Sequence, residues 1–198
     1  MEITGVRLIK QLSLEGFELE IEINPEDKKD VSDCAIFFEG EGQAIKDLNR
    51  TSEFIASLPK GKYTIYKTGA EHALPMYKGR TDFPFIVQNY NKWKNLGETM
   101  LHPTFSKGPY PHLHLQGDGG TQKIRNAKTP FCHRIFAMAF IKCPDLRFTI
   151  YVDHINEDKL DYSISNLQWV TASDNRSSLS NTTSNKGKKY GVWERTYI

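Results

Sequence analysis

The chain has 198 residues, of which 38% are hydrophobic and 12% aromatic, so it has enough apolar side chains for a packed core and is not expected to be disordered. No apolar run approaches the ~18–20 residues of a membrane span, and the first residues lack the features of a secretion signal, so we expect a cytoplasmic, intracellular protein. The net charge of +2 combines −3 over residues 1–80 with +5 over residues 81–198, which indicates that a polyanionic partner would meet the second part.

The first part of the chain alternates strand-like and helix-like patterns. Acidic and apolar residues alternate over 17–23, which predicts a half-buried strand, and further strands are expected at 35–38 and 62–68. Residues 46–58 have the spacing of an amphipathic helix. The residues expected to face inward are Leu48, Phe54, Ile55 and Leu58. These elements predict an α+β domain over residues 1–80, joined by a linker at 67–84 to the second part of the chain.

The second part is expected to hold short strands around one apolar helix. The predicted helix spans 131–141, with Ile135, Phe136, Ala139 and Phe140 facing inward. Strands are predicted within 85–96, at 111–116, 147–155 and 167–171, followed by a helix at 174–179 with Ser173 as its N-cap. Three scattered cysteines form no C-x-x-C pair and are expected to be reduced, mostly buried thiols.

The most informative segment is FTIYVDHINEDKLDYSISNLQWVTASDN, residues 148–175. A predicted strand carries Asp153 and His154, a loop leads to Asn166, a second strand carries Trp169, and a helix start presents Asn175. This order of strand, loop, strand and helix allows Asp153, His154 and Asn175 to converge, if the first strand bends at its end. Trp169 is expected in the core.

This segment resembles the HNH, or ββα-metal, nuclease family, whose motif reads roughly V-D-H-I-D-G, then N-L-x-W-V-T, then a final Asn or His. The preceding HRIFAMAF is similar to a helix of phage and intron-encoded HNH homing endonucleases, and 85–115 is similar to a small β module that often comes before them. The resemblance implies an α+β fold with a ββα-metal core over 126–180. Before it we expect a β-rich module over 81–125 and the domain over 1–80, and after it a basic arm over 181–198.

Hydrolysis of a phosphodiester needs a base for the attacking water and positive charge at the phosphate. His154 suits the base, because an imidazole titrates near neutral pH. Asp153 and Asn175 supply hard oxygen ligands for Mg²⁺ or another divalent cation such as Mn²⁺. One carboxylate and one amide carry too little charge for two ions, so a single-metal mechanism is expected. By resemblance, Asn166 braces the loop and orients the histidine.

Two positions depart from the family motif. Asn156-Glu157 replaces the usual Asp-Gly turn, and Asp161-Tyr162 replaces a common Asn-Asn. The acids Glu157, Asp158 and Asp161 would repel DNA phosphates unless they face away from the DNA.

Several other residues are candidates for DNA contact. Arg134 and Arg176 are expected to clamp phosphates, and Lys186, Lys188 and Lys189 to contact the backbone or form a solvated tail. His133 either touches DNA or supports the fold. His112 and His114 are expected on a solvated strand face.

The sequence thus predicts a metal-dependent DNA endonuclease, as a monomer or a homodimer. One alternative is a DNA-binding protein on an HNH scaffold that does not cleave. Another is a nuclease that residues 1–80 recruit to a protein partner.

Overall fold

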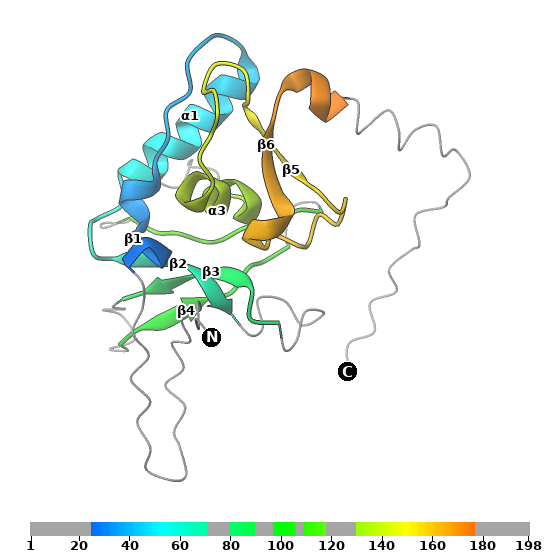
Figure 1. Cartoon of the computed structure of the whole chain (residues 1–198). Coiled ribbons are helices and arrows are strands. Elements are labelled where there is room, and N and C mark those ends of the chain that lie inside the picture. The colour runs from blue at the N-terminus through cyan, green and yellow to red at the C-terminus, as the bar shows by residue number, and fades with distance from the viewer. Residues whose placement is uncertain (1–24, 71–79, 90–96, 106–108, 118–129, 177–198) are drawn as a thin grey trace.

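The computed structural model describes residues 25–70, 80–89, 97–105, 109–117 and 130–176. They form helices and strands in mixed order, which confirms the predicted α+β class (Figure 1). The strands are β1 (Lys28–Asp30), β2 (Tyr63–Ala70), β3 (Phe83–Gln88), β4 (Thr99–Leu101), β5 (Tyr151–His154) and β6 (Leu167–Val170). The helices are α1 (Gln43–Ala56) and α3 (Cys132–Phe140), with short 3₁₀ turns η1 (Pro25–Asp27), η2 (Val31–Cys34) and η4 (Ile164–Asn166).

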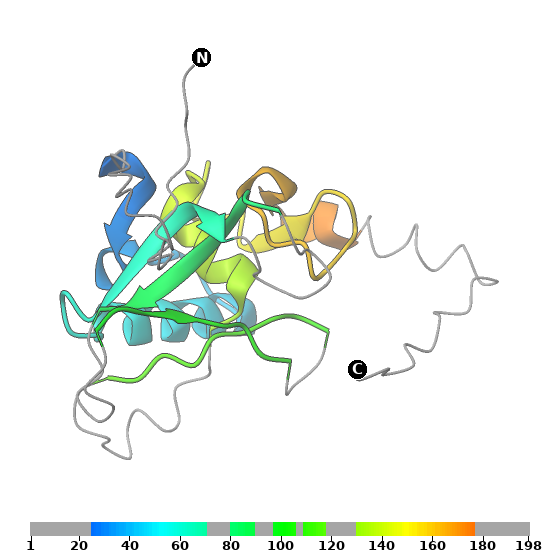
Figure 2. The same ribbon diagram turned by 90° about the horizontal axis from the view of Figure 1, so that it is seen from below.

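Strands β1 to β4 form one antiparallel sheet in sequence order, and β5 and β6 form a separate hairpin. Five of the six β3 residues are buried, as expected for an apolar strand inside a sheet. Helix α3 lies between the sheet and the hairpin and contacts both (Figure 1). Figure 2 shows the hairpin at one end of the molecule and η1 and β1 at the other.

The two longer predicted helices are present, with shifted ends. Helix α1 begins and ends a little earlier than the expected 46–58, after Gly42, whose φ of +115° suits a residue without a side chain. Its four predicted core residues are all buried. Helix α3 agrees with the expected 131–141 except that Phe140 is only half-buried.

One hydrophobic core joins segments that the sequence assigns to different domains. Strand β2 pairs with β3 across the expected boundary at residue 80. Phe38, before α1, packs on Trp169 of β6 with ring centroids 5.5 Å apart, and Lys29 donates a 2.8 Å hydrogen bond to the Ala139 carbonyl of α3. The residue 80 boundary is therefore not a boundary of this core, and the division into domains stays a prediction.

Three strand predictions are wrong or too long. Residues 35–38 form no strand, because side chains take their backbone groups: Asn49 bonds both the Phe38 N–H and its carbonyl, and the Ser52 hydroxyl bonds the Ile36 carbonyl. Only His112 of 111–116 pairs, in isolated bridges to Thr104 and Phe131. Strand β5 starts at Tyr151 instead of 147 because a turn closed by the Asp145 carbonyl and Thr149 N–H comes before it.

Some predictions fall outside the described residues, namely the strand at 17–23, half of the linker (71–79) and the lysines at 186, 188 and 189. Of the cysteines that we expected to be reduced, Cys34 and Cys132 are buried, Cys143 is half-buried, and all three are free thiols. In the described ranges, no helix is long and apolar enough to cross a membrane.

Candidate active site at the β5–β6 hairpin

The hairpin register determines where the two central residues of the motif point. Asp153 pairs with Gln168 and His154 with Leu167. Residues opposite one another lie on the same face of a sheet, and neighbours along a strand lie on opposite faces. His154 therefore shares the face of Leu167, which is buried, and Asp153 shares the face of Gln168, which is exposed. Strand β5 ends at His154, and a turn begins at the next residue.

His154 is 5% exposed and lies in a cluster of rings. Its imidazole centroid is 5.2 Å from that of His133 in α3 and 6.0 Å from the ring of Tyr110. Burial lowers the pKa of His154, although Asp153, Asp158 and Asp161 partly raise it. Burial also lowers the pKa of His133 well below its usual value. Both imidazoles are therefore neutral near pH 7.

Asn166 ties together the loop between β5 and β6. Its side-chain oxygen accepts a 3.0 Å hydrogen bond from the Asn156 N–H. Its amide nitrogen donates to the Asn156 side chain at 2.9 Å and to the Asp161 carbonyl at 2.7 Å. Its own carbonyl accepts from the N–H of Ile155, the residue after His154. The end of β5 is thus held by three bonds of one asparagine side chain and one of its backbone.

The acid at position 161 is turned inward. Asp161 is 6% exposed, and its carboxylate accepts hydrogen bonds from Ser163, Asn156 and Arg80, the last at 3.2 Å. Burial raises the pKa of Asp161, but the bonds from Ser163 and Arg80 lower it overall. Arg80 also bonds Asp82, so its guanidinium is shared between two carboxylates, and Asp161 does not present an unpaired charge to DNA. Glu157 and Asp158 are exposed.

Glu157 has a positive φ of +63°, the backbone region that glycine adopts most readily. Where the family motif has glycine, this chain therefore adopts a conformation that glycine favours while carrying a side chain. Tyr162, the other departure, is fully buried and stacks on Phe136 of α3 at 5.4 Å.

The segment after β6 carries Asn175 and Arg176. Residues 172–176 are helical, and Thr171, not the predicted Ser173, caps them, because its hydroxyl accepts the Asp174 N–H at 3.2 Å. Asn175 is half-exposed on this first turn, and its N–H donates to the Thr171 carbonyl. Arg176 is exposed, and its Nε bonds the Ala172 carbonyl.

The other predicted DNA contacts divide into three groups. Arg134 is half-buried, with its guanidinium 5.7 Å from the centre of the Phe131 ring. His133 is 5% exposed, which favours the supporting role over DNA contact. The three tail lysines lie outside the described residues.

His112 and His114 were expected on a solvated face. His112 is buried because Thr104 and Phe131 flank it, whereas His114 is exposed.

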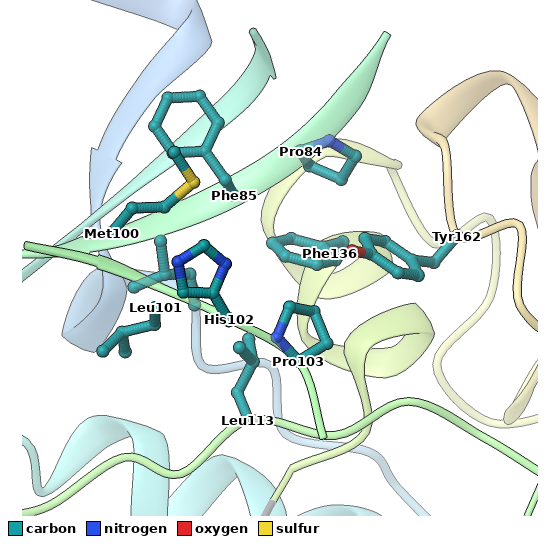
Figure 3. Close-up of a pocket in the computed structure, with 10 residues that line it drawn as sticks. Pro84, Phe85, Met100, Leu101, His102, Pro103, Leu113, Phe136 and Tyr162 are labelled. Atoms are coloured by element: carbon teal, nitrogen blue, oxygen red, sulfur yellow. The ribbon is translucent and has the colours of Figure 1, made fainter. Parts of the chain in front are cut away.

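A small hollow between β3, β4 and α3 is a separate feature (Figure 3). Its lining is almost wholly apolar, with Phe136 and Tyr162 side by side at one end and His102 as its one imidazole. Of the motif segment only Tyr162 lines it, and the candidate site residues Asp153, His154, Asn166 and Asn175 do not. Its chemistry suits packing, not hydrolysis.

Sequence reasoning missed Tyr110 and Arg80. Both lie in loops and reach the motif only through the tertiary fold, Arg80 across 81 residues. A tyrosine after Gly-Pro and an arginine in an expected linker carry no local signal of such contacts.

Comparisons with known proteins agree on the motif. Residues 149–177 match the family model described as HNH endonuclease. The chain is 34% identical over 91 residues to an uncharacterized HNH endonuclease of Acanthamoeba polyphaga mimivirus; the match covers 46% of this chain and 22% of the relative. No solved structure matches the chain. The predicted resemblance is confirmed: the segment 149–177 is similar to the HNH endonuclease family, and the chain spans about a fifth of the length of the viral relative.

Proposed function

We propose that the protein is a metal-dependent DNA endonuclease that hydrolyses phosphodiester bonds with one metal ion. The observation that carries the proposal is the position of His154: it ends β5 inside the family segment, and the Asn166 network holds the residues just after it. A histidine that only closed a turn would need no such network.

In this proposal His154 is the general base. Its lowered pKa keeps the imidazole neutral, the form that accepts a proton from water. The Nε2 atom is buried and has no hydrogen-bond partner among the described residues. The nitrogen left to face the attacking water is therefore Nδ1. Asn166 acts through the backbone at Ile155 and Asn156, which sets the direction of His154.

Asp153 and Asn175 would hold the metal ion. Asp153 lies on the exposed side of the hairpin, where a carboxylate can meet a hydrated ion, and Asn175 is half-exposed on the helix directly after the hairpin. A carboxylate and an amide oxygen suit Mg²⁺, or Mn²⁺, which keeps several waters in such sites. Among the described residues no three His, Cys, Asp or Glu side chains gather as a metal site, so the donor set proposed here is small. When bound, the ion would stabilise charge on the phosphate and on the leaving oxygen.

Positively charged side chains would bind the phosphates of the DNA backbone and so position the DNA. Arg176 is exposed one residue from the proposed ligand Asn175 and is the candidate nearest to it in sequence. We assign Arg134 and the lysines at 186, 188 and 189 the same task of phosphate contact. A single site of this kind would nick one strand, and a double-strand break would require a homodimer or two sequential cuts.

Nicking of a supercoiled plasmid tests the proposal. We expect cleavage with Mg²⁺ or Mn²⁺ and none with EDTA. Asp153→Ala and His154→Ala should each lower the rate by about 10²- to 10⁴-fold while DNA binding persists. The matched controls are Glu157→Gln, an exposed acid in the loop after β5, and His114→Ala, an exposed histidine outside the hairpin segment. Both should cut like the unmodified protein.

Three outcomes would contradict the proposal. Full activity in EDTA would exclude the metal, and unchanged activity of His154→Ala would exclude the base. DNA binding without cleavage under all metal conditions would favour the non-cleaving alternative. Because residues 25–70 belong to the common core, a protein partner of residues 1–80 should be sought with exposed substitutions such as Phe37→Ser, since removal of the segment would open the core.

A further inference from the structure

Tyr110 lies at the centre of the ring cluster around His154. Its ring centroid is 4.9 Å from that of His133, 5.9 Å from Phe131 and 6.0 Å from His154. The planes of Tyr110 and His154 are 27° apart, so the two rings face each other. His133 meets His154 at 62°, close to edge-to-face. Two of the neighbours of the His154 imidazole are therefore aromatic rings in different orientations.

Backbone hydrogen bonds hold the two residues that follow Tyr110. The Cys132 N–H at the start of α3 donates to the Pro111 carbonyl at 2.9 Å. His112 exchanges two backbone bonds with Thr104, at 2.9 and 3.0 Å. Tyr110 is thus joined by its next neighbours to α3, the helix that carries His133.

Tyr110 also contacts the loop after β5. The Lys159 ammonium lies 5.5 Å from the centre of the Tyr110 ring, within the range of a cation–π contact. Lys159 is exposed and belongs to the loop that Asn166 braces. Tyr110 therefore contacts both the proposed base, His154, and the loop that follows β5.

His133 adds a second, independent sign that the cluster is not ordinary packing. It is 5% exposed, and its Nδ1 atom is buried without a hydrogen-bond partner among the described residues. A buried nitrogen without a partner costs free energy that a phenylalanine at this place would avoid. Such costs are found where a polar ring is kept for its position beside a functional group.

We infer that Tyr110, together with His133, is a positioning residue that fixes the orientation of the His154 imidazole. The inference rests on the proposed function, because orientation matters only if His154 takes a proton from water. An imidazole turns about two side-chain bonds, and displacement of a reacting group by about 1 Å can cost about 10²-fold in rate. Rings on two sides remove that freedom before DNA arrives.

The experiment combines NMR of the ring protons of His154 with cleavage kinetics of the full chain. Because the Tyr110 ring faces His154, its ring current should shift those protons upfield. Tyr110→Leu should remove that shift and lower kcat about 10- to 100-fold with little change in KM, whereas Tyr110→Phe keeps the ring and should retain the shift and most of the activity. Phe148→Leu is the matched control, since Phe148 is 63% exposed and packs on Arg147.

The outcomes separate this inference from the proposed function. A His154 signal that is the same in Tyr110→Leu and in the unmodified protein would overturn the contact. A Tyr110→Leu variant whose His154 signal changes while its kcat does not would overturn the positioning role and leave the proposed nuclease function standing. An unmodified protein that cuts no DNA would overturn the proposed function itself. Thermal unfolding of each variant shows whether activity is lost because the protein unfolds. A Tyr110→Leu variant whose kcat falls only in proportion to its unfolded fraction would also overturn the inference.

Discussion

The region around α1 and the loop between β5 and β6 are held by different forces. In the α1 region, Leu48, Ile55 and Ile65 are almost completely buried, and apolar contact provides the stability. In the loop, buried positions include Asp161, Ser163 and Asn166, which bond to one another and to the backbone. Apolar packing tolerates small shifts of its members, whereas a hydrogen-bond network sets directions.

Two asparagines make this difference concrete. Asn49 bonds the N–H and carbonyl of Phe38, at 2.8 and 3.0 Å, and so holds a connection in the α1 region. Asn166 bonds the loop backbone in a similar way, next to His154. The same side chain thus serves structure at one place and, in our proposal, structure and catalysis at the other.

The largest expected change in stability comes from the apolar region. Ile55→Ala should lower the free energy of unfolding by about 2–5 kcal/mol, because it leaves a cavity in a fully buried site. Urea denaturation followed by circular dichroism measures it. If the variant folds at low temperature, its cleavage rate per folded molecule should be unchanged. A loss below about 1 kcal/mol would mean that the core is less tightly packed than described.

Asn166→Ala should lower the free energy of unfolding by about 1–3 kcal/mol, because it leaves the Asn156 N–H and the Asp161 carbonyl without this partner. It should also abolish most plasmid nicking. Asn49→Ala is the paired control: it should cost about 1 kcal/mol and leave nicking intact. Equal nicking by the two variants would remove the distinction drawn between the two asparagines.

Arg80→Met tests the charge inside the loop network. It should cost about 1 kcal/mol at pH 7, a modest value because the Arg80 side chain is 37% exposed. Arg80 bonds both Asp161 and Asp82, and the pKa of each carboxyl is lower in the folded protein than its ordinary value. The stability from the two carboxylates is therefore present above that ordinary value and is lost as pH falls through the folded pKa values. The difference between variant and unmodified protein should therefore shrink below about pH 4. Urea midpoints from pH 3 to 7 measure it, and a constant difference would contradict the pairing.

The smallest effect concerns position 157. Glu157→Gly should raise the free energy of unfolding by about 0.5 kcal/mol, because relief of the positive φ exceeds the entropy that glycine adds to the unfolded chain. Glu157→Gln keeps a side chain at the positive φ and should not raise the free energy of unfolding. Thermal unfolding distinguishes the two, and a less stable glycine variant would show that the glutamate side chain has a role in the loop.

Periodic segments and the motif were predictable from the sequence, whereas contacts between loops were not. The apolar spacing of α1 and α3 predicted their buried faces, since helix geometry is local. The order Asp153, His154, Asn166, Asn175 predicted the family, because the motif lies within 23 residues. Tyr110 and Arg80 could not be found, because they approach the motif only after distant segments pack.

The strand errors have a similar cause. Residues 35–38, AIFF, have high β propensity, yet Asn49 and Ser52 of α1 take their backbone groups, and Phe37 is 53% exposed. Only knowledge of where α1 packs would have predicted this. Likewise, the sequence suggests that Asp161 is an exposed acid, and only the fold shows that Arg80 lies beside it.

The shared core limits how this protein can be engineered. To graft the β5–β6 hairpin onto a DNA-binding protein, a designer would have to transfer α3 as well. The designer would then have to replace two contacts that α3 and β6 receive from the first third of the chain, namely the Lys29 ammonium on the Ala139 carbonyl and the Phe38 ring against Trp169. A chimera joined at residue 126 would expose both surfaces to water. Fusion partners should instead be appended at either end of the intact chain.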